Sequence, residues 1–398
     1  MFACFADARK AAVRLFVFMT LIVVSACTVP DRVGVTENTG QTIVPGAPVQ
    51  VALLIPGGSN AGSDRFLAAN LENAARMAIS DLVGVTIDLR VYNTGSDPLQ
   101  AARVANAAVD DGAQIILGPL YGEAANAAGV SVVNRNVNVL AFSNNPTIAG
   151  GNVFILGSTF GNTANRLVQY AGRQGINRYT VVHGTSVPGQ LGRDAIANAI
   201  RANGAQVTAI EGYPLSQQGV TDSASRIIAA ARNGGSDAIF YTGVPSGDGA
   251  DLPFILDAVT AAGLTSEETK FIGLTRWDAN AEIVTRPSAQ GGIFAVPDQA
   301  LKAAFESRYT AVYGEGPHPL AGLAYDGIAA IGALVAQGSS NALTKSSLTT
   351  AQGFQGTGGI FRFLPNGLNQ RGLAIAEIRN NQVITLEQAP RSFGGSGL

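Results

Sequence analysis

The sequence predicts an α/β protein built from two doubly wound lobes, each with a parallel sheet. Three observations lead to this prediction. The chain has 398 residues, which is too long for one average domain and suits two. From Val49 onward, short apolar runs alternate with Gly-containing loops and with stretches of helical periodicity. A strand, a crossover helix and a further strand form a parallel pair, and this pattern occurs twice along the chain.

The first lobe opens with the apolar run 51–55, which is typical of a parallel strand covered on both faces. The loop 56–60 ends this strand, and Ser63 can cap a helix that runs to Ile79 with its apolar residues on one face. An Ala-rich helix is expected at 99–110, and another helix precedes the last strand. Further strands are predicted at 85–91, 113–117 and 137–142.

The second lobe repeats the layout after residue 157. Its strands are predicted at 179–183, 207–210, 238–241, 270–274 and 293–296, and its helices at 163–174, 193–203, 222–232 and 252–262. Helices at 299–313 and 320–337 return to the first lobe, whereas 359–363 and 373–379 resemble strands. The expected boundaries are therefore 49–157 with 298–358 for lobe 1, 158–297 with 359–386 for lobe 2, and a disordered tail at 387–398.

The first residues have the pattern of a targeting segment. Arg9, Lys10 and Arg14 precede the apolar run 15–24, which is too short for a permanent membrane span and suits a signal peptide. The run leads into Val24-Ser25-Ala26-Cys27, which resembles a bacterial lipobox. We expect a lipoprotein signal peptide at 1–26, acylation of Cys27 and a flexible tether at 27–48. The alternative is an ordinary secretory signal cut after Ala26, which would leave a free thiol.

Composition excludes several classes of protein. With 46% hydrophobic and 14% charged residues, the chain can bury a real core, so wholesale disorder is excluded. The net charge of −2, without a Lys/Arg cluster beyond the first fourteen residues, argues against a nucleic-acid groove. Only two His and two Cys occur, so we expect no zinc site, no disulfide framework and no cofactor.

Three segments carry a family resemblance. The runs 51–56, 112–120 and 138–144 resemble type 1 periplasmic binding proteins of the leucine/isoleucine/valine-binding kind, over about residues 48–385. The run 140–157, together with the lipobox, resembles the penicillin-binding-protein activator lipoproteins, although the chain lacks the long helical N-terminal domain of many activators. The resemblance implies two Rossmann-like lobes joined by three crossovers around a central cleft.

In open parallel sheets, ligands bind beyond the carboxyl ends of the strands, where loops and helix N-termini converge. The polar and aromatic residues at these places are therefore candidates for ligand binding, although turn formation or helix capping would also explain each of them singly. The candidates are Ser59, Asn60, Leu120, Tyr121, Ser143, Asn144, Asn145, His183, Thr185, Tyr241, Thr242, Arg276, Trp277 and Asp278. The resemblance implies that Tyr121 and Ser143 align with positions that hold an amino-acid carboxylate. Asp278 and Asp248 are candidates for the acid that meets the ammonium group.

The sequence gives little support to catalysis. His183 is followed by Thr185 and Ser186, but the chain has no Gly-x-Ser-x-Gly elbow, so we expect no enzyme. The Gly-rich loop 243–249 lacks the Lys-Ser/Thr pair of a phosphate loop, and we expect it at the cleft mouth. Trp277 either stacks on a ligand or partner or covers the hinge, and His318 is expected to be structural.

Two functions remain open. The first is a lipid-anchored, periplasm-facing regulator of peptidoglycan synthesis, located at the outer membrane, whose partner is a penicillin-binding protein acting as peptidoglycan synthase. The second is a solute receptor that delivers an amino acid or similar polar ligand to an ABC permease. An anchor favours the activator in a cell with two membranes, because a shuttling receptor benefits from free diffusion. The sequence therefore favours the activator, with contact to the membrane only through the lipid.

Overall fold

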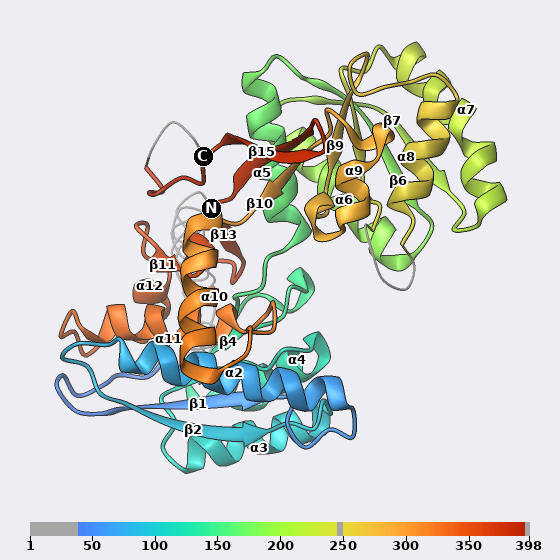
Figure 1. Cartoon of the computed structure of the whole chain (residues 1–398). Coiled ribbons are helices and arrows are strands. Elements are labelled where there is room, and N and C mark those ends of the chain that lie inside the picture. The colour runs from blue at the N-terminus through green and yellow to red at the C-terminus, as the bar shows by residue number, and fades with distance from the viewer. Residues whose placement is uncertain (1–38, 245–249, 395–398) are drawn as a thin grey trace, which may run out of the picture. The chain divides into compact units, whose positions relative to one another are not determined.

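The computed structural model describes residues 39–244 and 250–394. The first lobe is built on a wholly parallel sheet in the order β2-β1-β3-β4-β5 (Figure 1). Its strands are β1 (Val49–Ile55), β2 (Ile87–Asn93), β3 (Ile115–Leu117), β4 (Asn138–Ala141) and β5 (Val153–Ile155). This order is doubly wound, as the sequence predicts, and it places the change of winding direction between β1 and β3.

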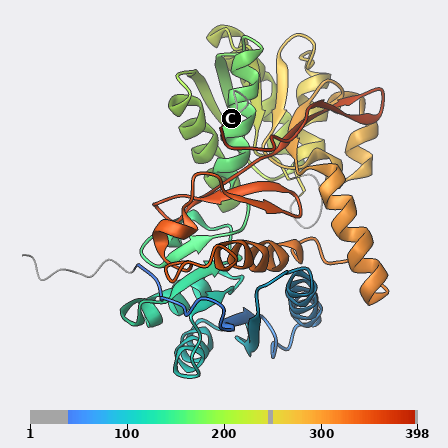
Figure 2. The same cartoon turned by 90° about the vertical axis from the view of Figure 1, so that its left-hand side faces the viewer.

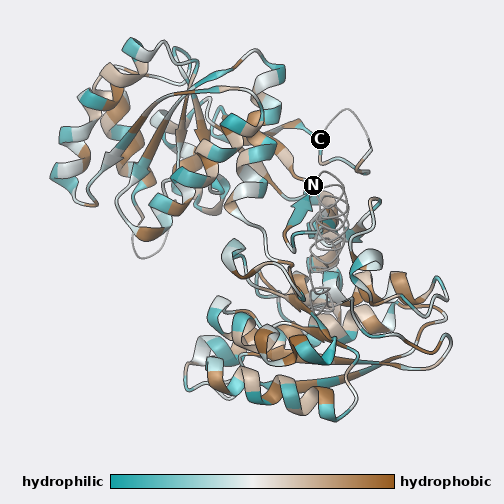
Figure 3. Cartoon of the chain, turned by 180° about the vertical axis from the view of Figure 1, so that it is seen from behind, coloured by the Kyte–Doolittle hydropathy of each residue, from teal (hydrophilic) through white to brown (hydrophobic). Residues whose placement is uncertain are grey.

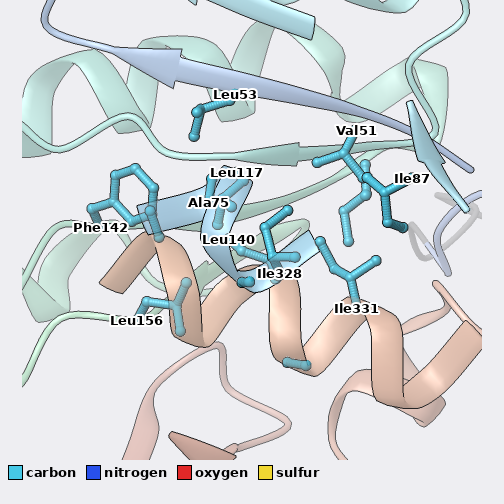
Figure 4. Packing of buried hydrophobic residues seen from close by; sticks show 14 of the residues in the cluster. Val51, Leu53, Ala75, Ile87, Leu117, Leu140, Phe142, Leu156, Ile328 and Ile331 are labelled. Carbon is cyan, nitrogen blue, oxygen red and sulfur yellow. The ribbon is translucent and has the colours of Figure 1, made fainter. Parts of the chain in front are cut away.

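Helices cover both faces of this sheet. The helices α2 (Gly62–Ser80) and α11 (Gly322–Val335) bury one face, and α3 (Pro98–Asp110) and α4 (Gly122–Val132) bury the other. Figure 4 shows Ile328 and Ile331 of α11 packed toward Leu117 and Leu140 of the sheet. Because both faces are covered, the inner strands β1 and β3 are mainly apolar, which explains the continuous run 51–55, whereas the edge strand β2 alternates apolar and polar residues.

The second lobe repeats the strand order and extends it. Its sheet reads β7-β6-β8-β9-β10-β14-β15. The first five strands are parallel, β14 pairs antiparallel with β10, and β15 pairs antiparallel with β14. The strands are β6 (Arg178–Gly184), β7 (Gln206–Tyr213), β8 (Ala238–Tyr241), β9 (Lys270–Gly273), β10 (Ile293–Val296), β14 (Ala374–Arg379) and β15 (Gln382–Glu387). The sequence analysis does not predict β15, whose edge position leaves every one of its side chains exposed or only partly buried.

The helices of lobe 2 also form two layers. One face carries α5 (Phe160–Arg173) and α6 (Val187–Ala202), and the other carries α7 (Gln217–Gly234) and α8 (Leu252–Ala261). In Figure 3 the strands are mainly brown, whereas the helices are banded in brown and teal. This is the pattern of helices with one apolar face against a buried sheet. The short helix α9 (Ala281–Thr285) lies between β9 and β10 in the chain.

A small third sheet corrects one predicted boundary. It consists of β11 (Phe354–Gly356), β12 (Gly359–Phe363) and β13 (Asn369–Arg371), all antiparallel. The sequence analysis assigns 359–363 to lobe 2, but Phe354, Phe361 and Phe363 belong to the core of lobe 1. The sheet lies against α11 (Figure 2). Aromatic packing decides its place, and strand periodicity carries no information about which core a strand joins.

The chain crosses between the lobes three times, as the family resemblance implies. The crossings lie between β5 and α5, between β10 and α10 (Gln299–Tyr313), and between β13 and β14. The third crossing is tied to the first, because the Asn369 side-chain amide donates to the carbonyls of Ile155 at 2.7 Å and Gly157 at 3.0 Å. Helix α10 joins the core of lobe 1 through Tyr309, and the short α12 (Lys345–Leu348) follows α11.

Two segments expected to be flexible are instead packed. Within the predicted tether, Ile43 is buried in the core of lobe 1, and its amide donates to the carbonyl of Ser340 at 2.8 Å. Within the predicted tail, Ala389 is buried in lobe 2, and the Phe393 ring lies 4.6 Å from the Arg362 guanidinium carbon. One or two apolar side chains anchor each segment, which composition alone cannot reveal.

The signal peptide at 1–26 and Cys27 lie outside the described residues, as do residues 28–38 of the tether and 395–398 of the tail. Among the helices that the structure describes, none combines the length and apolar character needed to cross a membrane.

Candidate functional site

A cavity of about 660 Å³ lies at the carboxyl end of the sheet of lobe 1. This volume falls within the range of small-molecule sites. Its walls come from the loops after β3, β4 and β5, from α10, from the segment 317–323, and from residues near the crossings between the lobes. Six of the predicted site residues line it: Leu120, Tyr121, Ser143, Asn144, Asn145 and Arg276.

The turn between β3 and α4 brings backbone amides to the cavity. Gly118 has a φ of +89°, and a Cβ there would collide with the Leu54 carbonyl, so only glycine permits this turn. Helix α4 then starts without a side-chain cap. Gly122 at its first position lies close to the loop after β4, since a Cβ there would be 3.1 Å from the Asn145 amide nitrogen. The first amides of α4 are thus available to an anion, and the helix dipole favours one.

The side chain of Tyr121 is hydrogen-bonded to a buried aspartate, Asp64. Its hydroxyl donates to one oxygen of Asp64 at 2.6 Å, and the Ser96 hydroxyl donates to the other oxygen at 2.6 Å. These bonds, with a further one from Ser59, lower the pKa of Asp64, whereas the bond to Asp64 raises the pKa of Tyr121. The ring of Tyr121 therefore has a fixed position in the cavity wall.

This network also explains the placement of Ser59. Ser59 supports Asp64 and does not line the cavity. The carbonyl of its neighbour Asn60 accepts from the Arg65 guanidinium at 3.0 Å, and Asn60 is likewise absent from the cavity wall. Both residues act as turn residues of lobe 1 in this structure.

Several charged side chains in the cavity wall form ion pairs, and the sequence analysis does not name most of these residues as site candidates. Asp326 is buried and pairs at 3.3 Å with Arg371, whose side chain is 11% exposed, and the Thr357 amide donates to Asp326 at 2.7 Å. Burial raises the pKa of Asp326 against the opposing effects of Arg371 and Thr357. Lys302 of α10 pairs with Glu306 at 2.5 Å. These residues follow the second crossing in the chain, so no strand-end rule points to them.

Three more acids bear on which carboxylate could meet an ammonium group. Glu123 of α4 lines the cavity, is exposed, and has no hydrogen bond or ion pair among the described residues. Asp278 pairs with Arg276 outside the cavity wall, and Asp248 lies outside the described residues. Of the acids considered, Glu123 is therefore the one with a free carboxylate at the cavity.

An apolar wall completes the cavity. Phe142 and Phe305 contribute to it, together with the segment Pro317–Leu320. Within that segment the His318 amide donates to the Asn70 side chain at 2.8 Å, and burial lowers the pKa of the His318 imidazole. His318 was expected to be structural; it stiffens the loop and also faces the cavity. Its position between two prolines was the available signal.

A family model described as "Periplasmic binding protein" matches residues 48–382. The chain belongs to this family. A crystal structure of a putative branched-chain amino acid ABC transporter protein from Rhodospirillum rubrum is similar, with a TM-score of 0.69 and 18% identity over 85% of this chain and 100% of that one. An ABC transporter substrate-binding protein from Desulfitobacterium hafniense in complex with Leu gives a TM-score of 0.59 and 18% identity, with coverage of 85% and 100%.

A solute-binding protein from R. palustris in complex with benzoate gives a TM-score of 0.53 and 16% identity, covering 88% of this chain and 99% of that one. The uncharacterized protein RP748 of Rickettsia prowazekii (strain Madrid E) is 23% identical over 155 residues. That match spans 39% of this chain and 40% of the relative. At these identities the solved structures establish the fold of this periplasmic binding protein.

Most of the predicted site residues of lobe 2 lie away from both cavities. His183, Thr185, Tyr241, Thr242, Trp277 and Asp278 line neither this cavity nor the smaller one described below. Tyr241 and Trp277 are fully buried, and Trp277 stacks on Phe294 with ring centroids 6.2 Å apart. Trp277 is therefore a core residue, so neither ligand stacking nor hinge covering describes it. His183 is also buried, with its Nδ1 2.9 Å from the carbonyl of Gly184.

The polar groups of the cavity wall are of the kind that recognise a ligand. In the part of the chain that the structure describes, no three His, Cys, Asp or Glu side chains are grouped to hold a metal ion. The wall offers backbone amides, a hydroxyl at Ser143, paired guanidinium groups and apolar rings, which are the elements of a recognition site for a small polar molecule.

Proposed function

We propose that this periplasmic binding protein is the receptor of an ABC transporter, which captures a small organic acid and presents it to a membrane permease. The observation that carries this proposal is the cavity of about 660 Å³ at the uncapped start of α4. A carboxylate there would accept hydrogen bonds from the first amides of the helix and from the Ser143 hydroxyl. The apolar wall around Phe142 and Phe305 would cover the rest of the ligand.

The comparisons support a carboxylate as the shared ligand group. Two similar structures contain Leu and benzoate, which differ in size and in the presence of an ammonium group but share a carboxylate. Glu123 offers a counter-charge to an ammonium group, so the cavity also suits an amino acid. We propose binding without catalysis, because the described wall residues offer no nucleophile paired with a base.

A second candidate is an activator of a penicillin-binding protein. The specific observation in its favour is the resemblance of residues 140–157 to activator lipoproteins, together with the lipobox at 24–27. The similar solved structures favour the receptor, since their descriptions name ABC transporters. Both candidates place the protein in the cell envelope, and we propose that acylated Cys27 attaches it to a membrane, most simply the outer one if the activator is correct.

The receptor is tested by a thermal-shift screen of the full chain against amino acids and aromatic acids. A ligand at 100 times its Kd adds about 2.7 kcal/mol to the folded state, which raises the Tm by several degrees. Ser143→Ala should weaken binding several-fold, because one hydrogen-bonding group facing the ligand is lost. Ser131→Ala is the matched control, since the Ser131 hydroxyl donates to the Ala128 carbonyl within α4 at 2.8 Å and does not line the cavity.

Pull-down from membranes separates the two candidates. Recovery of an ABC permease together with a ligand-dependent Tm supports the receptor. A flat ligand screen with recovery of a peptidoglycan synthase would overturn it in favour of the activator. Acylation is tested by mass spectrometry of the mature chain, and Cys27→Ala should release the protein from the membrane fraction.

A further inference from the structure

A second cavity of about 280 Å³ adjoins the first. The two cavities have five wall residues in common: Ser158, Arg276, Pro297, Gly358 and Arg371. The two cavities therefore meet along these residues, and a molecule in the first cavity would lie next to the second. The floor of the second cavity is apolar and buried, with Leu274, Ala295 and Ile360 among its residues.

The charged groups of the second cavity have one sign. Arg276 and Arg371 line it, whereas none of the wall residues assigned to it is an Asp or Glu. Hydroxyl groups make up the other polar part of the wall: Ser158, Thr159, Thr163 and Thr275, of which Thr275 already donates to the Gly243 carbonyl at 2.6 Å. The wall of the first cavity also contains the acids Glu123, Glu306 and Asp326. The partners of the two arginines, Asp278 and Asp326, pair with them from outside the wall of the second cavity. Guanidinium and hydroxyl donors over an apolar floor are the chemistry that recognises a carboxylate or another small anion.

Both guanidinium groups are held in place and keep donors free. Arg276 binds both carboxylate oxygens of Asp278, with its Nε 2.9 Å from Oδ1, which uses two of its five N–H donors. Arg371 donates from Nε to the Leu156 carbonyl at 3.2 Å, again to that carbonyl from Nη2, and from Nη1 to Asp326. Three of its five donors are used, so donors remain on both residues at little cost in side-chain entropy.

We propose that the second cavity is an anion subsite, and that the ligand is a diacid with one acidic group at the start of α4 and the other between Arg276 and Arg371. This inference rests on the proposed receptor function and narrows its ligand class. A ligand with a neutral far end would leave the desolvated donors of both arginines unpaired, which is unfavourable. The diacid class includes dicarboxylates and acids whose second anionic group is a phosphate.

The test compares ligands that differ only in the second acid. Calorimetric titration of the full chain uses a series of aliphatic and aromatic dicarboxylic acids, with the mono-amide of each as its partner, and phosphorylated monoacids as a separate arm. We expect the diacid to bind about 10- to 100-fold more tightly than its mono-amide, since a charged hydrogen-bonded group is replaced by a neutral one. The phosphate arm reports which anion the subsite prefers.

Variants locate the effect. Arg276→Gln should reduce the preference for the diacid to within about threefold, and Thr163→Val, which alters the wall of the second cavity alone, should reduce it by a smaller factor. Thr221→Val is the matched control, because the exposed Thr221 hydroxyl donates to the Gln217 carbonyl within α7. Thr163→Val keeps the test valid if Arg276→Gln unfolds because Asp278 loses its partner.

The outcomes separate this inference from the proposed function. If monoacids bind as tightly as diacids, the receptor stands and the anion subsite is wrong. If a diacid preference exists but neither Arg276→Gln nor Thr163→Val changes it, the second acid binds elsewhere and the subsite is again wrong. If no acid of any kind binds, the receptor itself fails.

Discussion

The two lobes share one strand order and, at the carboxyl end of each sheet, a tyrosine that donates to an aspartate. In lobe 1 the pair is Tyr121 and Asp64 at 2.6 Å, and in lobe 2 it is Tyr213 and Asp251 at 2.7 Å. Tyr121 is 40% exposed and lines the larger cavity, whereas Tyr213 is completely buried. The hydrogen bond from Tyr121 to Asp64 raises the pKa of Tyr121, while desolvation is the main cause of the raised pKa of Tyr213.

The difference between Tyr121 and Tyr213 shows that strand order indicates at which end of a sheet a ligand can bind. It does not indicate which lobe supplies the residues that line the cavity. In lobe 2 the start of α6 lies over the end of β8, where a Cβ on Gly192 would be 2.9 Å from the Thr242 methyl group. Asp251 is occupied by the Val244 amide and by Tyr213. The strand ends of lobe 2 therefore stabilise their own loops, and the cavity takes Arg276 and Pro297 from this lobe.

The largest expected effect tests whether Tyr241 is structural. Tyr241→Ala should lower the free energy of unfolding by about 3–5 kcal/mol, because a fully buried ring that packs on Phe271 is removed. Ligand affinity of the folded protein should change by less than about twofold. Urea unfolding followed by tryptophan fluorescence measures the loss, since the single tryptophan, Trp277, lies in the core of lobe 2.

Tyr241→Phe is the matched control for this truncation. The Tyr241 hydroxyl is buried and has no hydrogen-bond partner in the described structure, so its removal should be neutral or slightly stabilising. A tenfold loss of affinity in Tyr241→Ala without loss of stability would show that lobe 2 contributes this strand end to the ligand site after all.

Removing the hydroxyl groups of Tyr213 and Tyr121 should have smaller effects, and on different properties: stability for Tyr213 and ligand affinity for Tyr121. Tyr213→Phe should cost about 1.5–3 kcal/mol of stability, because a buried hydrogen bond to a carboxylate is lost, and should leave affinity unchanged. Tyr121→Phe should instead weaken ligand binding about three- to tenfold, because the freed ring must be immobilised on binding. Circular dichroism measures the stability of both variants, and titration calorimetry measures their ligand affinity. Equal changes of stability and of affinity in the two variants would remove the distinction between the lobes.

The sequence was informative where local chemistry sets the structure. Apolar strands and helical periodicity placed the parallel strands, and the strand-end rule found Tyr121, Ser143 and their neighbours because carboxyl ends of adjacent strands converge. The same rule also named residues of lobe 2 that line neither cavity, since burial of Tyr241 and Trp277 depends on how helices pack. Residues such as Arg371 reach the cavity through a crossing distant in the chain, and no local pattern records that contact.

The start of helix α5 is a second feature that the sequence alone does not determine. The helix predicted from Thr163 begins at Phe160, because the Thr159 hydroxyl accepts from the Asn162 amide and so caps the first turn. Several hydroxyl residues in this segment could serve as the cap, and tertiary packing selects one. The cap and the first turn of α5 line the second cavity through Thr159, Phe160 and Thr163.

The smallest expected effect concerns Asp64, the carboxylate that accepts the hydrogen bond from Tyr121. Hydrogen bonds from Ser96, Tyr121 and Ser59 lower the pKa of Asp64 below its ordinary value. A carboxyl whose pKa is lowered by folding stabilises the protein above its unfolded pKa, near 4, and this contribution is lost as the pH falls through the lowered folded value.

The chain has 28 Asp and Glu residues, so the effect must be read as a difference between wild type and Asp64→Asn. We expect the difference in free energy of unfolding to be constant between about pH 5 and 7 and to shrink below about pH 4. Urea unfolding at several pH values, followed by circular dichroism, measures it. A difference that stays constant into strong acid would mean that Asp64 gains nothing from its ionised form, and Tyr121 would then be placed by packing alone.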